Sequence, residues 1–71
     1  MNEFELWLCV IGGESDNERL LYRGDDRMEV DRIINECDDE VTTDPDKYFL
    51  LNDMTFYSYR DYAERRPHYE D

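Results

Sequence analysis

The chain has 71 residues, 39% of them apolar and 14% aromatic, and its 20 acidic residues against eight basic ones give a net charge of −12. This length excludes a second domain, and the aromatic content favours a folded chain despite the charge. The longest apolar run, Leu6 to Ile11, falls far short of the ~20 residues of a membrane span, and the acidic N-terminus is unlike a secretory signal. We expect one acidic domain over residues 1–71, frayed at 68–71, in the cytoplasm (the host cytoplasm if a phage encodes it).

The first two strands are predicted over residues 4–11 and 19–23, joined as a hairpin by a loop of about six residues. In the first strand an apolar set alternates with a mixed set, so one face should be buried and the other only partly covered. The apolar set is Phe4, Leu6, Leu8 and Val10, and the mixed set is Glu5, Trp7, Cys9 and Ile11. In the second strand, alternation places Leu20 and Tyr22 on one side and Leu21 on the other.

A helix is predicted after Gly24, with Asp26 as its N-cap and Glu29 in the capping-box position. An apolar stripe at helical spacing continues to the linker at residues 42–46. The stripe consists of Val30, Ile33, Ile34, Cys37 and Val41. On the polar side Arg32 and Glu36 are spaced for an ion pair. Three acids at the C-terminal end, Asp38 to Glu40, would oppose the helix dipole.

A third strand is predicted over residues 47–51, and the segment after it is ambiguous. Asn52-Asp53 could turn the chain into a fourth strand from Met54 to Tyr59. Alternatively the strand runs on to Phe56, and Ser58 caps a short helix that ends before Pro67. We favour a fourth strand followed by a brief helical turn.

These elements predict an α+β fold, a small antiparallel sheet of three to four strands with one amphipathic helix packed on one face (ββαββ-like). The helix stripe should lie on the face that carries Phe4, Leu6, Leu8 and Val10. Cys37 belongs to this stripe and Cys9 to the opposite sheet face, so the two sulfurs should not meet. We therefore expect two free thiols.

Residue types typical of catalysis are scarce, and we expect no enzyme. The single histidine, His68, lies four residues from the C-terminus, where little would hold its ring in place. Gly12-Gly13 lacks the spacing of a phosphate loop. Acids at 38–40, 44 and 46 have the oxygen ligands that calcium prefers, but the order of an EF-hand loop is absent. We expect neither a metal site nor a cofactor.

Two features remain as candidates for binding. The first is an acidic block from Asp25 to Asp46, where ten acids and two arginines leave a net charge of −8. The second is the aromatic C-terminal third, because tyrosine is favoured at interfaces. The predicted partner-binding residues are Asp25, Asp26, Glu29, Asp31, Glu36, Asp38, Asp39, Glu40, Asp44, Asp46, Tyr59 and Tyr62.

Acids along a helix flank are spaced on the scale of the phosphates of a duplex, so this block could imitate a nucleic acid. In size, acidity and lack of catalytic residues the chain resembles small phage-type inhibitors of the anti-CRISPR, anti-restriction and uracil-DNA glycosylase inhibitor classes. This resemblance in composition implies an inhibitor whose partner is the basic surface of a nucleic-acid enzyme or complex, with no direct binding to nucleic acid or membrane.

Two other interpretations stay open. One is a protein-interaction regulator, of a host-takeover or antitoxin-like kind, in which Tyr59 and Tyr62 anchor the partner and the acids only steer it. The other is an assembly protein with a self-complementary face, which would form a homodimer. Salt dependence separates the first two, since charge-driven binding weakens as salt rises and a tyrosine-anchored interface changes little.

Overall fold

The computed structural model describes residues 3–12 and 18–65. Four strands form one sheet in the order β2-β1-β3-β4, and every neighbouring pair is antiparallel. This is the predicted α+β fold, with three helical segments where one helix and a brief turn were expected. In chain order the elements are β1 (Phe4–Val10), β2 (Arg19–Gly24), α1 (Arg27–Glu36), α2 (Asp38–Thr42), β3 (Lys47–Leu51), β4 (Met54–Phe56) and α3 (Tyr59–Arg65).

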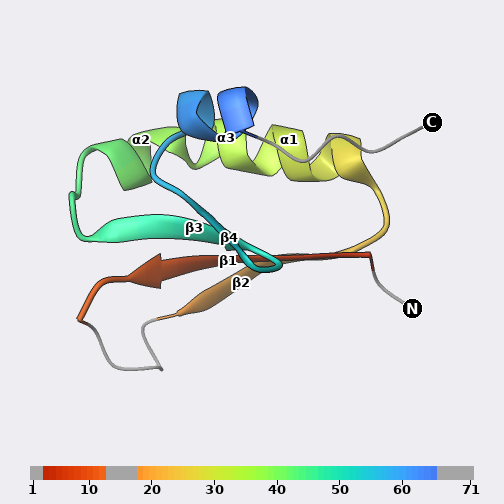
Figure 1. Ribbon diagram of the computed structural model, residues 1–71, viewed down its shortest axis with the longest axis horizontal. Helices are drawn as coiled ribbons and strands as arrows, with labels where there is room; N and C mark the ends of the chain where they lie inside the picture. Colours follow the sequence, from red (N-terminus) through yellow and green to blue (C-terminus); the bar gives the residue numbers. More distant parts are fainter. Residues whose placement is uncertain (1–2, 13–17, 66–71) are drawn as a thin grey trace.

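All three helices lie on the same side of the sheet, so the molecule has two layers and one sheet face without a helix (Figure 1). Phe4, Leu6 and Leu8 are buried beneath the helices, as predicted, whereas Val10 is only half-buried. No helix in the described ranges is long and apolar enough to cross a membrane. The buried core consists of Phe4, Leu6, Leu8, Val30, Ile34, Val41, Phe49, Leu51, Phe56 and Tyr62.

The β1–β2 pairing contains an irregularity that the simple alternation did not predict. Leu6 pairs with Tyr22 and Trp7 with Leu20, so Leu21 is an extra residue in β2. Leu21 and Tyr22 therefore both pack against the core, while Leu20 points to the other face and is 39% exposed. The predicted grouping of Leu20 with Tyr22 is wrong, because a bulge reverses the side-chain alternation of a strand.

The bulge positions Tyr22 to help begin α1. The Tyr22 hydroxyl accepts a hydrogen bond from the Asp26 backbone N–H (2.9 Å). The side chain passes over Gly24, where a Cβ atom would collide with the same hydroxyl. Asp26 is the N-cap, as predicted, and accepts from the Met28 N–H (3.0 Å). Glu29 does not complete a capping box, because Tyr22 already occupies the Asp26 N–H.

The single predicted helix is two helices, divided at Cys37, whose backbone (φ −93°, ψ 4°) departs from helical geometry. The hydrogen bonds from the Cys37 N–H to the Ile33 carbonyl (2.9 Å) and from the Val41 N–H to the Cys37 carbonyl (3.3 Å) continue across the break. Val41 consequently stays in the core with Val30 and Ile34. The acids at 38–40 now form the first turn of α2, where the helix dipole favours negative charge.

The turn between β3 and β4 depends on Asn52, which adopts a left-handed backbone conformation (φ 52°) that asparagine tolerates better than most residues. The Asn52 N–H donates to the Glu5 carbonyl (3.0 Å), and the Asn52 Oδ1 accepts from the Glu5 N–H (3.0 Å). The side-chain amide thus extends the β1–β3 ladder by one step, and the chain turns back at Asp53.

Each of the two readings of the segment after β3 is partly right. The turn leads into a fourth strand, but this strand ends at Phe56 rather than at Tyr59. Ser58 then caps α3, since its Oγ accepts from the Asp61 N–H (2.9 Å). The predicted stop at Pro67, the fraying of residues 68–71 and His68 lie outside the described residues.

Both cysteines carry free thiols and lie on opposite faces of the sheet. Cys9 is buried and Cys37 half-buried, and burial raises the pKa of both thiols. Alkylation of the denatured protein without reductant should therefore modify two cysteines. In the native protein Cys37 should react faster than Cys9, since its side chain is the more accessible. An unmodified pair in the mass spectrum of the denatured protein would contradict the assignment of the two sheet faces.

A matched pair of substitutions tests the position of the helix. Ile34→Asp should unfold the domain, because an unpaired charge buried in the core costs several kcal/mol out of the ~5–15 kcal/mol that typically stabilises a domain. Asn35→Asp adds the same charge at the next residue, which is exposed, and should leave a cooperative thermal transition by circular dichroism. Cooperative unfolding of the Ile34→Asp variant near the wild-type temperature would refute this packing of α1.

Candidate functional site

The acidic block, residues 25–46, forms most of the helical layer. Asp25 and Asp26 precede α1, and Asp44 and Asp46 follow α2. The ten residues of α1 alone span ~15 Å, so the block begins and ends at opposite ends of this layer. The structure therefore places the predicted acids along one side of the molecule, but it gives them different tasks.

At the start of α1 the acids hold backbone N–H groups. The Asp25 carboxylate accepts from the Glu3 N–H (2.6 Å), which ties the beginning of β1 to the segment before the helix. Asp26 caps α1, as described above. Carboxylates at this position are stabilised by the unpaired N–H groups and the dipole of the helix.

Along α1 the acids are paired. Arg32 forms ion pairs with Glu29 and with Glu36 (2.7 Å to the latter), and the hydrogen bond from Arg32 lowers the pKa of the Glu29 carboxyl. These three exposed side chains together carry a single negative charge. Asp31 accepts a hydrogen bond from the Tyr62 hydroxyl and so joins α1 to α3. The charge along α1 is thus partly neutralised by Arg32, whereas the acids of residues 38–40 have no basic residue beside them in the block.

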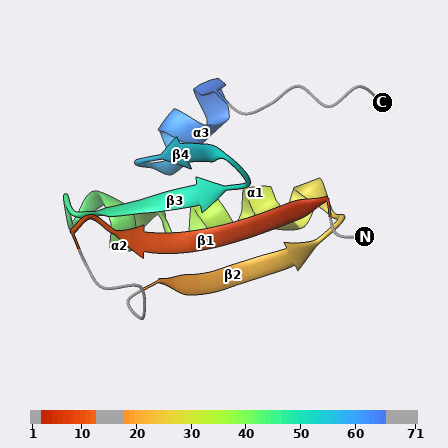
Figure 2. The ribbon, with the colours of Figure 1, turned by 60° about the horizontal axis from the view of Figure 1, so that its bottom comes forward.

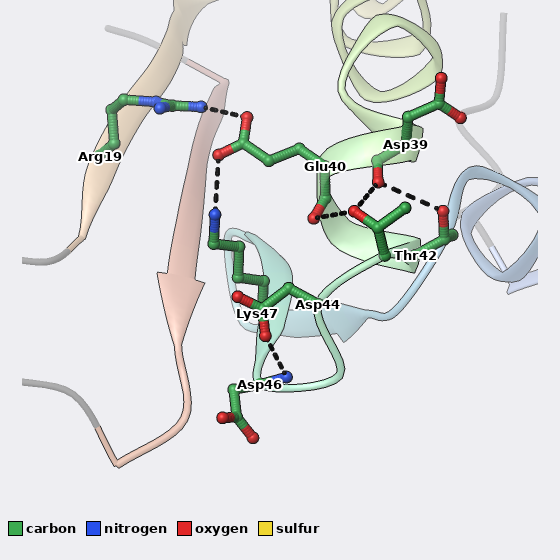
Figure 3. A network of polar contacts seen from close by, with 8 residues as sticks. Arg19, Asp39, Glu40, Thr42, Asp44, Asp46 and Lys47 are labelled. Carbon is green, nitrogen blue, oxygen red and sulfur yellow. Dashed lines mark hydrogen bonds and ion pairs between the residues drawn. The ribbon is translucent and has the colours of Figure 1, made fainter.

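Glu40 connects α2 to two strands that are not neighbours. Its carboxylate accepts from Arg19 of β2 (3.0 Å) and from Lys47 of β3 (3.2 Å), which reach it from either side of β1 (Figure 3). These hydrogen bonds, the one from Arg19 being the stronger influence, lower the pKa of the Glu40 carboxyl. Glu40 therefore links α2 to β2 and β3, a role that the sequence did not reveal.

Two further acids of the block satisfy backbone groups, and two do not. Asp38 accepts from the Tyr59 N–H at the start of α3 (2.7 Å), and Asp44 accepts from the Asp46 N–H (3.0 Å). The carboxylates of Asp39 and Asp46 point away from this network (Figure 3), and both residues are exposed. Within residues 3–12 and 18–65, these two are the carboxylates of the block that make no hydrogen bond or ion pair.

The tyrosines predicted to bind a partner belong largely to the core. Tyr62 is 1% exposed and its ring packs edge-on against Phe56 (5.3 Å between centroids, 88°), so almost none of its surface is open to a partner in this conformation. Tyr59 is half-buried and packs against the same core, with its ring 6.2 Å from that of Tyr62. The spacing of residues 59 and 62 along a short helix, both facing the sheet, explains their burial.

The tyrosines that do reach solvent were missed as site residues. Tyr57 is 52% exposed, and its ring lies 6.1 Å from that of half-buried Tyr48 on the sheet face without helices. The signal in the sequence was strand alternation: because Phe49 is apolar and central, Tyr48 must point to the opposite face.

A metal site is not formed by the acids at 38–40, 44 and 46. Among the residues described, no group of three or more His, Cys, Asp or Glu side chains is arranged to hold an ion. Glu40 is directed at Arg19 and Lys47, Asp38 at α3, and Asp39 at solvent. The acids that are close in sequence are thus directed to different neighbours.

Glu40 and Asp39 are adjacent in sequence, and they allow a carboxylate with structural contacts to be compared with one that has no partner. Glu40→Gln removes two ion pairs and should lower the free energy of unfolding by roughly 0.5–1 kcal/mol, the range of solvent-screened pairs. Asp39→Asn removes the same charge but no such contact, and it should leave stability unchanged within about 0.5 kcal/mol. Urea denaturation of both variants measures the difference. Equal changes in the two variants would show that the ion pairs of Glu40 with Arg19 and Lys47 add nothing to stability.

The geometry thus offers an acidic helical layer, in which Asp39 and Asp46 are the most available charges, and an aromatic sheet face on the other side. No family model, curated protein or solved structure matches this chain.

Proposed function

We propose that this protein is a non-catalytic inhibitor whose acidic helical layer occupies the basic nucleic-acid-binding surface of a DNA- or RNA-handling enzyme. The observation that carries the proposal is the separation of charge between the two faces. Residues 25–46, with a net charge of −8, form most of the helical layer. On the helix-free sheet face the charged strand residues are Glu5 and Arg23, which neutralise each other at 3.0 Å.

Rigid placement of the charges supports this function. Asp25, Asp26, Asp38 and Asp44 each accept a backbone N–H, so their carboxylates are fixed in position by the fold. A preorganised set of charges loses little conformational freedom on binding, as the phosphates of a stiff duplex do. A basic groove could therefore bind this layer in place of nucleic acid, and the negative potential would speed the encounter.

The alternative function, a regulator anchored by Tyr59 and Tyr62, has weaker support. Tyr62 cannot contact a partner without opening the core, and Tyr59 is partly covered. Of its two anchor residues, this alternative therefore keeps Tyr59 alone.

The test uses charge reversals that spare the structural acids. Asp39→Lys/Asp46→Lys changes the two unpartnered carboxylates of the block, and Glu18→Lys/Asp53→Lys changes two exposed acids outside it by the same total charge. The immobilised wild-type protein first captures its partner from a lysate of the source cell. The captured partner should be displaced by duplex DNA or RNA, and its affinity should fall about tenfold or more for the Asp39/Asp46 variant in low salt.

The control variant should bind within about threefold of wild type, since distant charges act mainly through the screened overall field. All affinities should fall between about 0.05 and 0.3 M NaCl. A partner that nucleic acid cannot displace, or equal affinities for the two double variants, would refute nucleic-acid mimicry.

A further inference from the structure

The sheet face without helices is a second candidate surface. Pairing of Trp7 with Leu50 and of Cys9 with Tyr48 places these side chains opposite the core, since their neighbours Leu6, Leu8, Phe49 and Leu51 are buried on the other side. Leu20 extends the same face on β2 and is 39% exposed; Tyr57, beside Tyr48, extends it beyond β4 and is 52% exposed. Trp7, Tyr48 and Leu50 in the middle are half-buried. Figures 1 and 2 show the helices on the opposite side.

This face carries much less charge than the helical layer. Glu5 and Arg23 pair with each other, and the Trp7 indole N–H donates to the same Glu5 carboxylate (2.8 Å). Glu18, which precedes β2, lies close enough to Cys9 and Tyr48 to help raise the pKa of both groups and adds a negative charge at the edge of the face. The other strand residues that point to this face are Trp7, Cys9, Leu20, Tyr48, Leu50 and Thr55, all uncharged. A patch of aromatic and aliphatic side chains with little charge is typical of an interaction surface.

We infer that this face binds a second copy of the chain, so that two sheets pack face to face with the helical layers outside. Both copies carry a net charge of −12, and two copies that meet through this weakly charged face keep their acidic layers on the outside, away from each other. The Glu5–Arg23 pair offers both signs of charge to its symmetry mate, as a two-fold interface requires. The distribution of charge on the molecule therefore favours a second copy of the chain as the partner of this face.

The geometry of stacked sheets keeps the acidic layers apart. Two packed sheets lie ~10 Å from each other, and each helical layer adds about another 10 Å. The two acidic layers would then be about 30 Å apart, several times the Debye length of ~8 Å at physiological salt. Their mutual repulsion would be largely screened.

The size of the face predicts a weak dimer. The four strands have seven, six, five and three residues and so average ~17 Å in length. With four strands ~14–19 Å across, the face covers roughly 240–320 Å² in projection. Interfaces at this low end belong to transient complexes. We expect a dissociation constant on the order of 10–100 µM.

Sedimentation equilibrium of the purified protein tests the inference directly. A monomer–dimer equilibrium should appear between about 10 and 500 µM protein, and it should tighten several-fold from about 0.05 to 0.5 M NaCl as salt screens the like charges. Emission from Trp7, the single tryptophan, should shift to shorter wavelength with the same concentration dependence as it becomes buried. Salt acts in the opposite direction on binding of the acidic layer to a basic partner, so the two proposals can fail separately.

Three variants locate the interface. Leu20→Glu and Tyr57→Glu each add a charge at an already exposed position of the face, which the fold should tolerate, and each should weaken the dimer about tenfold or more. Met28→Glu adds the same charge at a residue of α1 that is 75% exposed, and it should change the dimer constant by less than about threefold. A wild-type monomer at every concentration and salt, an unshifted Trp7 emission, or an equal effect of Met28→Glu would overturn the inference.

Discussion

A small domain with a net charge of −12 must stay folded despite repulsion between its carboxylates. The contacts that these carboxylates make shape much of the helical layer. Self-repulsion lowers the stability of any compact state, and a chain of this length has a thin margin to lose. Several acids in the helical layer accept hydrogen bonds or form ion pairs that offset part of this repulsion. Asp26 caps α1, Asp38 accepts the first N–H of α3, and Glu40 joins α2 to β2 and β3. The carboxylates that crowd the surface also hold the helices on the sheet.

Sequence periodicity was sufficient for the elements whose residues alternate or repeat without interruption. The burial of Leu6 and Leu8 and the stripe through Val30, Ile34 and Val41 follow from it. The bounds of β3 follow instead from the strand propensity of its residues. Periodicity failed to predict the structure where a single residue interrupts the regular backbone of an element. The bulge at Leu21 reverses the two faces of β2, and Cys37 divides the helix without moving its apolar stripe. Neither irregularity changes the spacing of apolar residues in a way that a periodic pattern reveals.

The candidate site shows the same limit. Charge density alone located the acidic layer, but it could not distinguish Glu40, which binds two cations of the sheet, from Asp39, which meets solvent. That difference requires knowing where Arg19 and Lys47 lie in space. The burial of Tyr62 was missed for a related reason. Tyr62 is a core residue because α3 packs against Phe56, and the sequence left open whether the strand ends at Phe56 or at Tyr59.

The two faces are not independent if both bind as inferred. A basic partner on the helical layer would neutralise part of the charge that opposes dimer formation, so it should strengthen association through the sheet face. By thermodynamic reciprocity, the dimer would then hold such a partner more tightly by the same factor. A dimer would also expose two acidic layers on opposite sides. A partner with two basic sites could bind both layers, and the spacing of those sites would set the effective concentration for the second binding step. A weak dimer is enough for this coupling, because each surface is formed by the folded monomer whether or not the other surface is occupied.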